Sequence, residues 1–363
     1  MNKSVLALTS LLTVAIGCNA NASEFGKPIV STIPVTTHNI AQDQQHKTKQ
    51  VYLMNIPLTA KQKNQIVKFQ PNKIASATFA NNTLPKQIQL GMNNTPVLDQ
   101  GRHGTCVTFA MTAAVDALLG KGDYVSQLCS LELGSYIEKR SYTPSGWEGS
   151  WGNLVLNQIL QYGIVNKQTQ QQKSCSGMTE YPRDQESNVG NPMTLDDFKL
   201  NSENLNENIF SITLLSVPQR LLWNLAEAQS NMDSVIQNVK KELAAKTENA
   251  SVRVVFGTLL PYQHGTAGAC AKFHETNDTW ALTAEIKADT NPELGGHEMV
   301  ITGYDDDATA VDKDSVKHTG LFTLRNSWGA DAGDEGNYYM TYDYFKQFAI
   351  EARKVELVKS DLK

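Results

Sequence analysis

The sequence predicts an α+β fold in which helices come first and an antiparallel sheet follows. Segments with helical character gather before about residue 250, whereas runs with strand composition follow it, at 251–260, 299–304 and 320–325. Residues 107–119 are almost free of charge, contain no glycine or proline and lie between glycines. This pattern predicts a buried helix in the first half of the fold.

Length and charge limit the classes of protein that fit. The chain has 363 residues, 40% of them hydrophobic, which is enough for one large domain or two modest ones. The formal net charge of −5 gives no electrostatic reason to expect nucleic acid as a partner. Beyond the N-terminus no run is long and apolar enough to span a bilayer, so we expect no transmembrane anchor. We also expect a monomer.

Residues 1–22 have the pattern of an export signal, with Lys3, an apolar stretch and a small-residue cleavage site at Ala20-Asn21-Ala22. Their removal would give a secreted or periplasmic protein. A lipoprotein site in which Cys18 is acylated is the alternative interpretation. Ordinary cleavage is favoured because Ala15 stands where such a site usually has a larger apolar residue.

Residues 23–83 form a polar segment with its own pattern. Two β-prone runs, at 29–35 and 50–56, predict a hairpin. Thr59-Ala60-Lys61-Gln62 has the form of a capping box and predicts a short helix to about Phe69. Because a unit of this size is not stable alone, we expect it to pack on the rest of the chain.

Cys106 stands at the start of the predicted buried helix, with Thr105 as candidate N-cap. A nucleophilic cysteine attacks as the thiolate, which a helix N-terminus and a nearby imidazole favour. A lone cysteine on a core helix is more often structural, so Cys106 alone does not identify a catalytic site.

His297 and Asn326 supply the other groups that thiol chemistry needs. His297 follows Gly295-Gly296 and opens a strand-like run, whereas Asn326 ends another. Adjacent antiparallel strands would let the amide oxygen of Asn326 accept a hydrogen bond from one ring nitrogen of His297. The other nitrogen would then face the thiol. Each residue alone is also explained as a polar strand end or a turn residue.

The motifs PVLDQGRHGTCVTFA, GGHEMVITGY and LRNSWG, in this order, resemble those of the papain-like (C1) cysteine peptidases. The resemblance covers about 84–363. It implies a papain-like two-lobed fold with a helical N-terminal lobe, an antiparallel β-barrel-like C-terminal lobe and the active-site cleft between them. It also implies a triad of Cys106, His297 and Asn326.

The resemblance assigns further roles. Gln100 would be the side-chain donor of the oxyanion hole, with the Cys106 N–H as second donor. Trp328 would shield the histidine–asparagine hydrogen bond from water. Gly149 and Ser150 fall on the paired glycines of the family's substrate loop, where backbone pairs with an extended peptide.

Departures from the family pattern concern the walls of the cleft. His103 and Trp147 stand where the family has the two halves of a disulfide. Val107 and Ala332 replace aromatic residues on the leaving-group side. Glu298 follows the base, where a small residue usually lines the pocket for the second side chain before the scissile bond. A carboxylate there would favour a basic or polar group. The alternative is that Glu298 faces solvent or meets a nearby Lys or Arg.

The remaining cysteines and acidic residues give weaker signals. If Cys106 is the nucleophile, Cys129, Cys175 and Cys270 can form at most one bridge, with Cys175 the strongest candidate.

Residues 168–215 are rich in Asn, Gln, Ser and Pro and are interpreted as a surface insertion. An apolar helix at 216–228 and an amphipathic one after it are expected. Neither the Asp305–Asp307 run nor the histidines near Cys270 match a calcium or zinc site, so we expect no metal and no cofactor.

These residues together predict an exported cysteine peptidase that acts on peptide or protein substrates. By the resemblance, its N-terminal segment, residues 23–83, would cover the cleft as an inhibitor, although the usual long prosegment helix motif is absent. An accessory module that stays attached is the alternative. A papain-like acyl-transferase and a catalytically silent peptide-binding protein remain open.

Overall fold

The computed structural model describes residues 25–35, 48–68, 84–141, 143–185, 191–205, 209–214, 232–245 and 250–358. The expected export signal with Cys18, and the apolar helix expected at 216–228, lie outside the described residues. Within the described part of the chain, no helix is long and apolar enough to cross a membrane.

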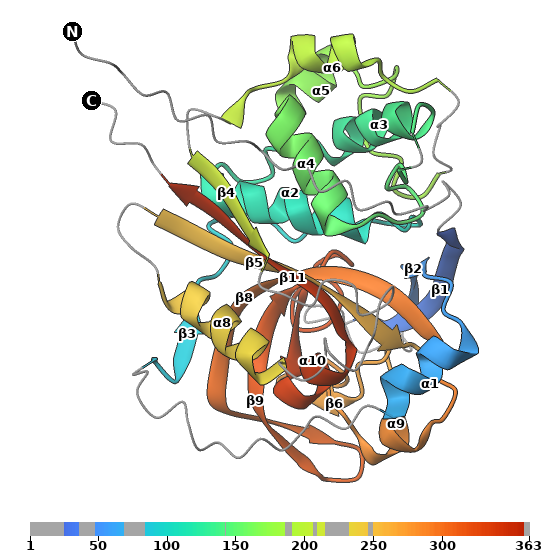
Figure 1. The fold of residues 1–363 in the computed structure, drawn as a ribbon, viewed down its shortest axis with the longest axis vertical. Coiled ribbons are helices and arrows are strands. Elements are labelled where there is room, and N and C mark those ends of the chain that lie inside the picture. Colours follow the sequence, from blue (N-terminus) through green and yellow to red (C-terminus); the bar gives the residue numbers. More distant parts are fainter. Residues whose placement is uncertain are drawn as a thin grey trace, which may run out of the picture.

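One lobe of the molecule is helical (Figure 1). Its described helices are α2 (Cys106–Leu119), α3 (Gln127–Glu138), α4 (Gly152–Tyr162), α5 (Lys167–Lys173) and α6 (Leu195–Asn201). Helix α2 confirms the predicted buried helix, since all of its residues except Leu119 are buried. It packs against α3 and α4 on one side and against the sheet on the other.

The second lobe is a sheet with short helices around it (Figure 1). Its elements are β4 (Ile209–Leu214), α8 (Met232–Ala244), β5 (Ala250–Pro261), β6 (Ala271–Lys272), β7 (Thr279–Trp280), α9 (Ala284–Ala288), β8 (Leu294–Asp312), β9 (Lys317–Arg325), β10 (Asn337–Thr341), α10 (Tyr342–Phe348) and β11 (Ala349–Val358). The strand order is β4-β11-β5-β8-β6-β7-β10-β9, and β9 also pairs with β8. That last pairing closes a ring of strands, so the predicted α+β fold with a barrel-like second lobe is confirmed. The short β7–β10 pair is parallel, unlike the rest.

Strand β8 begins earlier than the sequence predicts. His297 is the fourth residue of this strand rather than its first, because Gly295 and Gly296 already pair with β5. The missing side chains of these glycines leave room for Leu53 and Ile56 of the N-terminal segment. Glycine, a weak strand former, therefore belongs to the strand here because another segment lies over it.

The N-terminal segment forms the predicted hairpin and helix. Strands β1 (Gly26–Pro34) and β2 (Thr48–Asn55) pair antiparallel, and helix α1 (Ala60–Lys68) follows. The capping box is formed, because Gln62 N–H donates to Thr59 Oγ1 and Thr59 N–H donates to Gln62 Oε1. After it, β3 (Gln87–Gln89) adds to β8. The hairpin lies at one end of the junction between the two lobes (Figure 1).

The segment 168–215 is more than the surface insertion that its composition suggests. Cys175 forms a disulfide with Cys129 of α3. Met193 and Phe198 are buried in a core that the segment shares with α3. A few apolar residues among the polar ones are enough to make the part of this segment up to α6 belong to the helical lobe, because they meet an apolar face of α3. Its end, β4, belongs to the sheet.

Candidate active site

Cys106 is the first residue of α2 and is fully buried. Thr105 precedes the helix as predicted, but its side chain makes no capping hydrogen bond. Burial and the nearby Glu298 carboxyl raise the pKa of the Cys106 thiol, whereas backbone N–H groups of Glu298, Val107 and Cys106 itself lower it. The thiol thus lies against the residue that follows His297 on β8, and burial dominates, so it is protonated in this form.

His297 and Asn326 lie side by side, as the expected pairing of neighbouring strands requires. His297 Nε2 lies 2.7 Å from Asn326 Oδ1, which also accepts a hydrogen bond from the Ser327 N–H. An amide oxygen only accepts, so Nε2 carries the proton and Nδ1 is the free base. Burial lowers the pKa of His297 to about 4, with the Asn326 hydrogen bond acting in the opposite direction. The imidazole is therefore neutral at neutral pH.

Trp328 covers this hydrogen bond. Its ring stacks on His297 with 4.6 Å between ring centroids and an interplanar angle of 26°, and only 1% of Trp328 is exposed. The hydrogen bond therefore lies in a water-poor environment, which strengthens it. In the described part of the chain, Nδ1 of His297 has no hydrogen-bond partner.

Gln100 is held by the loop that carries Asn326. Its backbone N–H donates to Ser327 O at 2.9 Å, and its Oε1 accepts from Ser327 Oγ at 2.8 Å. This fixes the direction of Nε2, which donates to His103 O at 2.8 Å and to Tyr52 O at 3.0 Å. One Nε2 proton of Gln100 is thus bound by His103, three residues further along the chain, and the other is bound by Tyr52 of β2.

The N-terminal hairpin covers the same region. Met54 of β2 pairs with Gly296 of β8, next to His297. Phe25 occupies the space over Gly149 and packs on Trp151, with ring centroids 5.3 Å apart. Ser150 is buried. The proposed substrate loop is therefore covered by residues of the chain itself.

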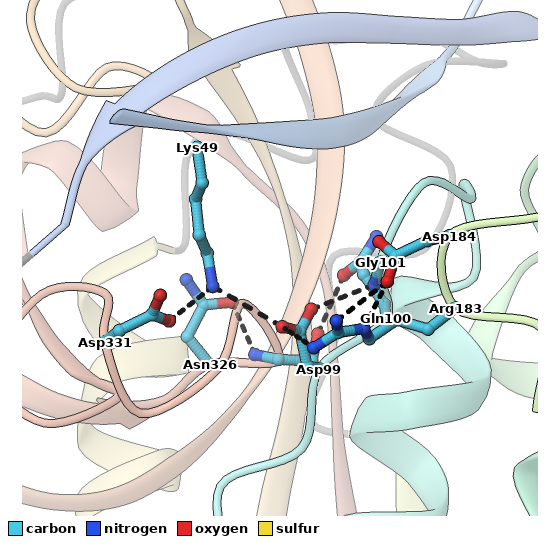
Figure 2. A network of polar contacts seen from close by, with 9 residues as sticks. Lys49, Asp99, Gln100, Gly101, Arg183, Asp184, Asn326 and Asp331 are labelled. Carbon is cyan, nitrogen blue, oxygen red and sulfur yellow. Dashed lines mark hydrogen bonds and ion pairs between the residues drawn. The ribbon is translucent and has the colours of Figure 1, made fainter. Parts of the chain in front are cut away.

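A charged contact ties the hairpin to both lobes. Lys49 Nζ lies 2.5 Å from Asp331 Oδ1 and 3.5 Å from Asp99 Oδ2, and Asp99 also meets Arg183 at 3.5 Å. Figure 2 shows Lys49 extending from the hairpin to Asp331 on one side and Asp99 on the other, above Asn326. Neither Lys49 nor Tyr52 belongs to a recognisable motif, so the sequence gives no signal for these contacts.

Glu298 is buried rather than facing solvent. Burial raises its pKa well above the ordinary value, and the charge of Glu351 and a hydrogen bond to Glu351 add to this effect. Glu351 also accepts from Gly152 N–H at 2.9 Å and pairs with Arg353. Glu298 thus faces another carboxyl rather than solvent, and the ion pair of Arg353 is with Glu351. One feature of the sequence indicates this buried partner of Glu298. Glu351 is an acidic residue within the otherwise apolar run Ala349-Ile350-Glu351-Ala352.

His103 and Trp147 lie together, with ring centroids 5.1 Å apart. An aromatic contact therefore joins the positions at which the family pattern has a disulfide. The disulfide of this chain lies elsewhere, between Cys129 and Cys175, and Cys270 is a free thiol. Among the described residues, no cluster of three metal-ligating side chains occurs.

Part of the sheet lobe matches a known protein family. Residues 274–360, about a quarter of the chain, match the family model described as Peptidase C1-like family. This part carries His297 and Asn326. This match confirms the resemblance to papain-like peptidases over this part of the chain.

Solved structures of cysteine proteases are similar at low identity. Xylellain from Xylella fastidiosa is 17% identical, with 76% of this chain and 86% of that chain covered and a TM-score of 0.44. Digestive procathepsin L 3 of Tenebrio molitor larval midgut is 15% identical, with 81% and 77% covered and a TM-score of 0.41. The Carica candamarcensis protease CMS1MS2 in complex with E-64 is 16% identical, with 74% and 97% covered and a TM-score of 0.42. A comparison with curated proteins gave no match.

Proposed function

We propose that the protein is an exported cysteine peptidase that is made as a zymogen, with residues 23–83 covering the cleft. The single observation that carries this proposal is the contact of Gln100 Nε2 with the main-chain oxygen of Tyr52, at 3.0 Å. An inhibitory segment that places its own carbonyl oxygen on the side-chain donor of an oxyanion hole excludes a substrate carbonyl from that donor.

The catalytic chemistry follows from the arrangement of donors and base. Nδ1 of His297 takes the thiol proton, and the Cys106 thiolate attacks the peptide carbonyl carbon. The tetrahedral oxyanion accepts from Gln100 Nε2 and from the Cys106 N–H. The imidazolium then protonates the leaving amine, which gives an acyl-enzyme. Water, deprotonated by His297, attacks this thioester, and the carboxylic acid product leaves with the thiol restored.

Electrostatics of the covered form support the inhibited state. The thiol of Cys106 has a raised pKa because it is buried, and the pKa of His297 is lowered for the same reason. A neutral thiol is a poor nucleophile, and a neutral imidazole supplies no positive charge to favour the thiolate. Water that enters when the hairpin leaves would restore the thiolate–imidazolium pair, since both shifts come chiefly from desolvation.

The export signal at residues 1–22 is part of the proposal. Removal of this signal leaves Phe25 near the start of the mature chain. Phe25 packs over Gly149, so the mature N-terminus would start beside the substrate loop. Mass spectrometry of the exported protein tests this: a start near Ser23 is expected, and an acylated Cys18 contradicts it.

Trimming and active-site labelling together test the zymogen. A site for a specific protease, inserted between α1 and β3, allows residues 23–83 to be cut from the body. An epoxide that alkylates papain-like thiols should label Cys106 only after the cut and removal of the hairpin, and Cys106→Ala should not be labelled. Equal labelling before and after trimming contradicts the inhibitory role and favours an accessory module.

Product analysis separates the remaining functions. A peptidase gives a carboxylic acid product, whereas an acyl-transferase gives an amide when a primary amine is added. A trimmed protein that binds peptides but neither cleaves nor joins them would be a silent peptide-binding protein.

A further inference from the structure

The turn that carries the nucleophile is supported by a segment outside the motifs. Residues 181–183 run along residues 101–105, the turn that connects Gln100 to Cys106. Arg102 N–H donates to Arg183 O at 2.8 Å, and a ring nitrogen of His103 lies 2.8 Å from Pro182 O. This support comes from the segment 168–215, which the family motifs do not include.

Gly101 permits this close approach. Its φ is +59°, and a Cβ at this position would lie 2.0 Å from Arg183 O. Both the backbone conformation and the space therefore require glycine. The main chain of the turn is therefore in direct contact with the main chain of residues 181–183.

The hydroxyl of Tyr181 bridges the two ends of the turn. It lies 2.9 Å from Gln100 O and 3.0 Å from Thr105 Oγ1. Burial raises the pKa of Tyr181, so the hydroxyl keeps its single proton. That proton goes to the Gln100 carbonyl, which can only accept, and the Thr105 hydroxyl then donates to the Tyr181 oxygen. The backbone of Thr105, at φ −88° and ψ 13°, is outside the extended conformation of capping residues, which is consistent with a side chain that bonds Tyr181 and does not cap α2.

The ring of Tyr181 has little freedom to move. It stacks parallel to Trp147 at 5.9 Å between centroids and meets Phe109 edge-on at 5.0 Å. The chain before it is tied to α3 by the Cys129–Cys175 disulfide, and Gln170 Nε2 donates to Thr179 O at 2.7 Å. The hydroxyl is therefore held at a fixed place relative to the turn.

We infer that Tyr181 is a positioning residue that fixes the separation of the two oxyanion donors. One donor is the side chain of Gln100, and the other is the N–H of Cys106, directly after Thr105. Because Tyr181 holds Gln100 O and Thr105 Oγ1 with one hydroxyl, loss of this hydroxyl frees the two ends to move apart. This inference rests on the proposed peptidase function and concerns the stabilisation of the oxyanion, not the thiol itself.

The test compares two reactions of the trimmed protein. Peptide hydrolysis passes through an oxyanion, whereas alkylation by iodoacetamide displaces iodide from a saturated carbon and needs no oxyanion donor. For Tyr181→Phe, kcat for peptide hydrolysis should fall about 10-fold, less than the 10²–10³-fold loss typical of removing a donor outright. KM and the alkylation rate should stay within about twofold, because binding and the thiol environment do not depend on this hydroxyl.

Two further variants make the test specific. Thr105→Val removes the other partner of the bridge, and the double variant should lose no more than either single one, because both changes break the same connection. Tyr262→Phe, which removes a remote hydroxyl that donates to Glu293 at 2.9 Å, is the matched control and should keep full activity. If Tyr181→Phe does not fold, Thr105→Val alone carries the test.

Each outcome has a distinct meaning. Unchanged kcat in Tyr181→Phe and Thr105→Val overturns the inference while the peptidase function stands. An equal fall of hydrolysis and alkylation overturns it too, because the hydroxyl would then act on the nucleophile. A trimmed wild-type protein that is alkylated but cleaves no peptide contradicts the proposed function and, with it, this role of Tyr181.

Discussion

The main-chain oxygen of Tyr52 accepts a hydrogen bond of 3.0 Å from Nε2 of Gln100. A donor assigned to a reaction intermediate is therefore occupied by the chain itself. The side chain of Gln100 cannot turn away, because Ser327 Oγ holds its Oε1 at 2.8 Å. Activity in this protein should consequently depend on contacts that keep β2 in place, and these contacts can be changed one at a time.

Phe25→Ala should loosen the cover without touching the catalytic residues. Phe25 is 7% exposed and packs on Trp151, and truncation of a buried phenylalanine typically costs about 3–5 kcal/mol. Untrimmed Phe25→Ala protein should thus be labelled by the epoxide at least about 10-fold faster than wild type. Phe273→Ala, which loses an aromatic contact with Tyr339 in a separate cluster, is the matched control. Equal labelling of the two variants would contradict a role of Phe25 in covering the cleft.

Lys49→Met should weaken the charged contact between the hairpin and the body. The contact with Asp331 is partly exposed, and such pairs contribute up to about 1 kcal/mol, or about fivefold in an equilibrium. We expect labelling of untrimmed protein to rise up to about fivefold at low salt. High salt should raise wild-type labelling toward the variant's level, because salt screens exposed pairs. Lys86→Met, which removes an exposed pair with Asp307, should change nothing.

Acid should destabilise the covered form through His297. Its folded-state pKa is about 4, below the ordinary 6.5, so the native state binds fewer protons than the unfolded state between these values. Stability is present above pH 6.5 and is lost as pH falls toward 4, by roughly 3 kcal/mol. Thermal unfolding of Cys106→Ala protein at pH 7 and pH 4.5 measures the loss. His297→Gln should show a smaller loss over the same range, and an identical loss would exclude His297 as its source.

Glu298→Gln should stabilise the protein at neutral and alkaline pH. The folded-state pKa of Glu298 is raised by burial and by Glu351, so the native state holds a proton that the unfolded state releases above about pH 4.5. This acid therefore contributes stability that is fully present below pH 4.5 and is lost as pH rises through the folded-state pKa. Glutamine keeps a hydrogen-bonding group without the titration. The melting temperature of Glu298→Gln should exceed that of wild type at pH 8 but not at pH 4.5; an equal difference at both values would contradict this explanation.

Substrate selection by Glu298 stays a prediction. The carboxyl is buried with Glu351 and Arg353 in the covered form, so a basic group of the chain already lies near it. Profiling of trimmed wild-type and Glu298→Ala protein with a peptide library measures the effect on the second residue before the scissile bond. Identical profiles would show that Glu298 does not select substrates.

The sequence predicts the parts of this site that depend on local pattern. Cys106 at the start of a buried helix, and Asn326 beside His297 on neighbouring strands, follow from hydrophobic runs and their ends. The capping box at Thr59 and Gln62 is equally local. The helix start, the strand ends and the capping box each lie within about ten residues of chain, where periodicity and turn residues carry information. The contact of Asn326 with His297 spans 29 residues and follows because their strands, β8 and β9, are consecutive and paired.

Other contacts leave no local signal. The bond between Tyr52 O and Gln100 Nε2 uses a main-chain oxygen, which every residue has. The pairing of Glu298 with Glu351 depends on β8, β5 and β11 lying side by side, which only the strand order determines. Tyr181 lies 75 residues after Cys106 in a polar segment, and nothing near it indicates that its hydroxyl reaches the nucleophile's turn.

The strand ladder between β2 and β8 consists of the single pair Met54 and Gly296. In contrast, β8 is paired with β5 and β9 over much of its length, and the ring of strands is closed by that second pairing. Departure of the hairpin therefore exposes hardly any unpaired strand edge on the catalytic body. Under the proposed activation, the trimmed protein therefore exposes no long unpaired strand to other chains and should stay dispersed at concentrations where a longer exposed strand would aggregate.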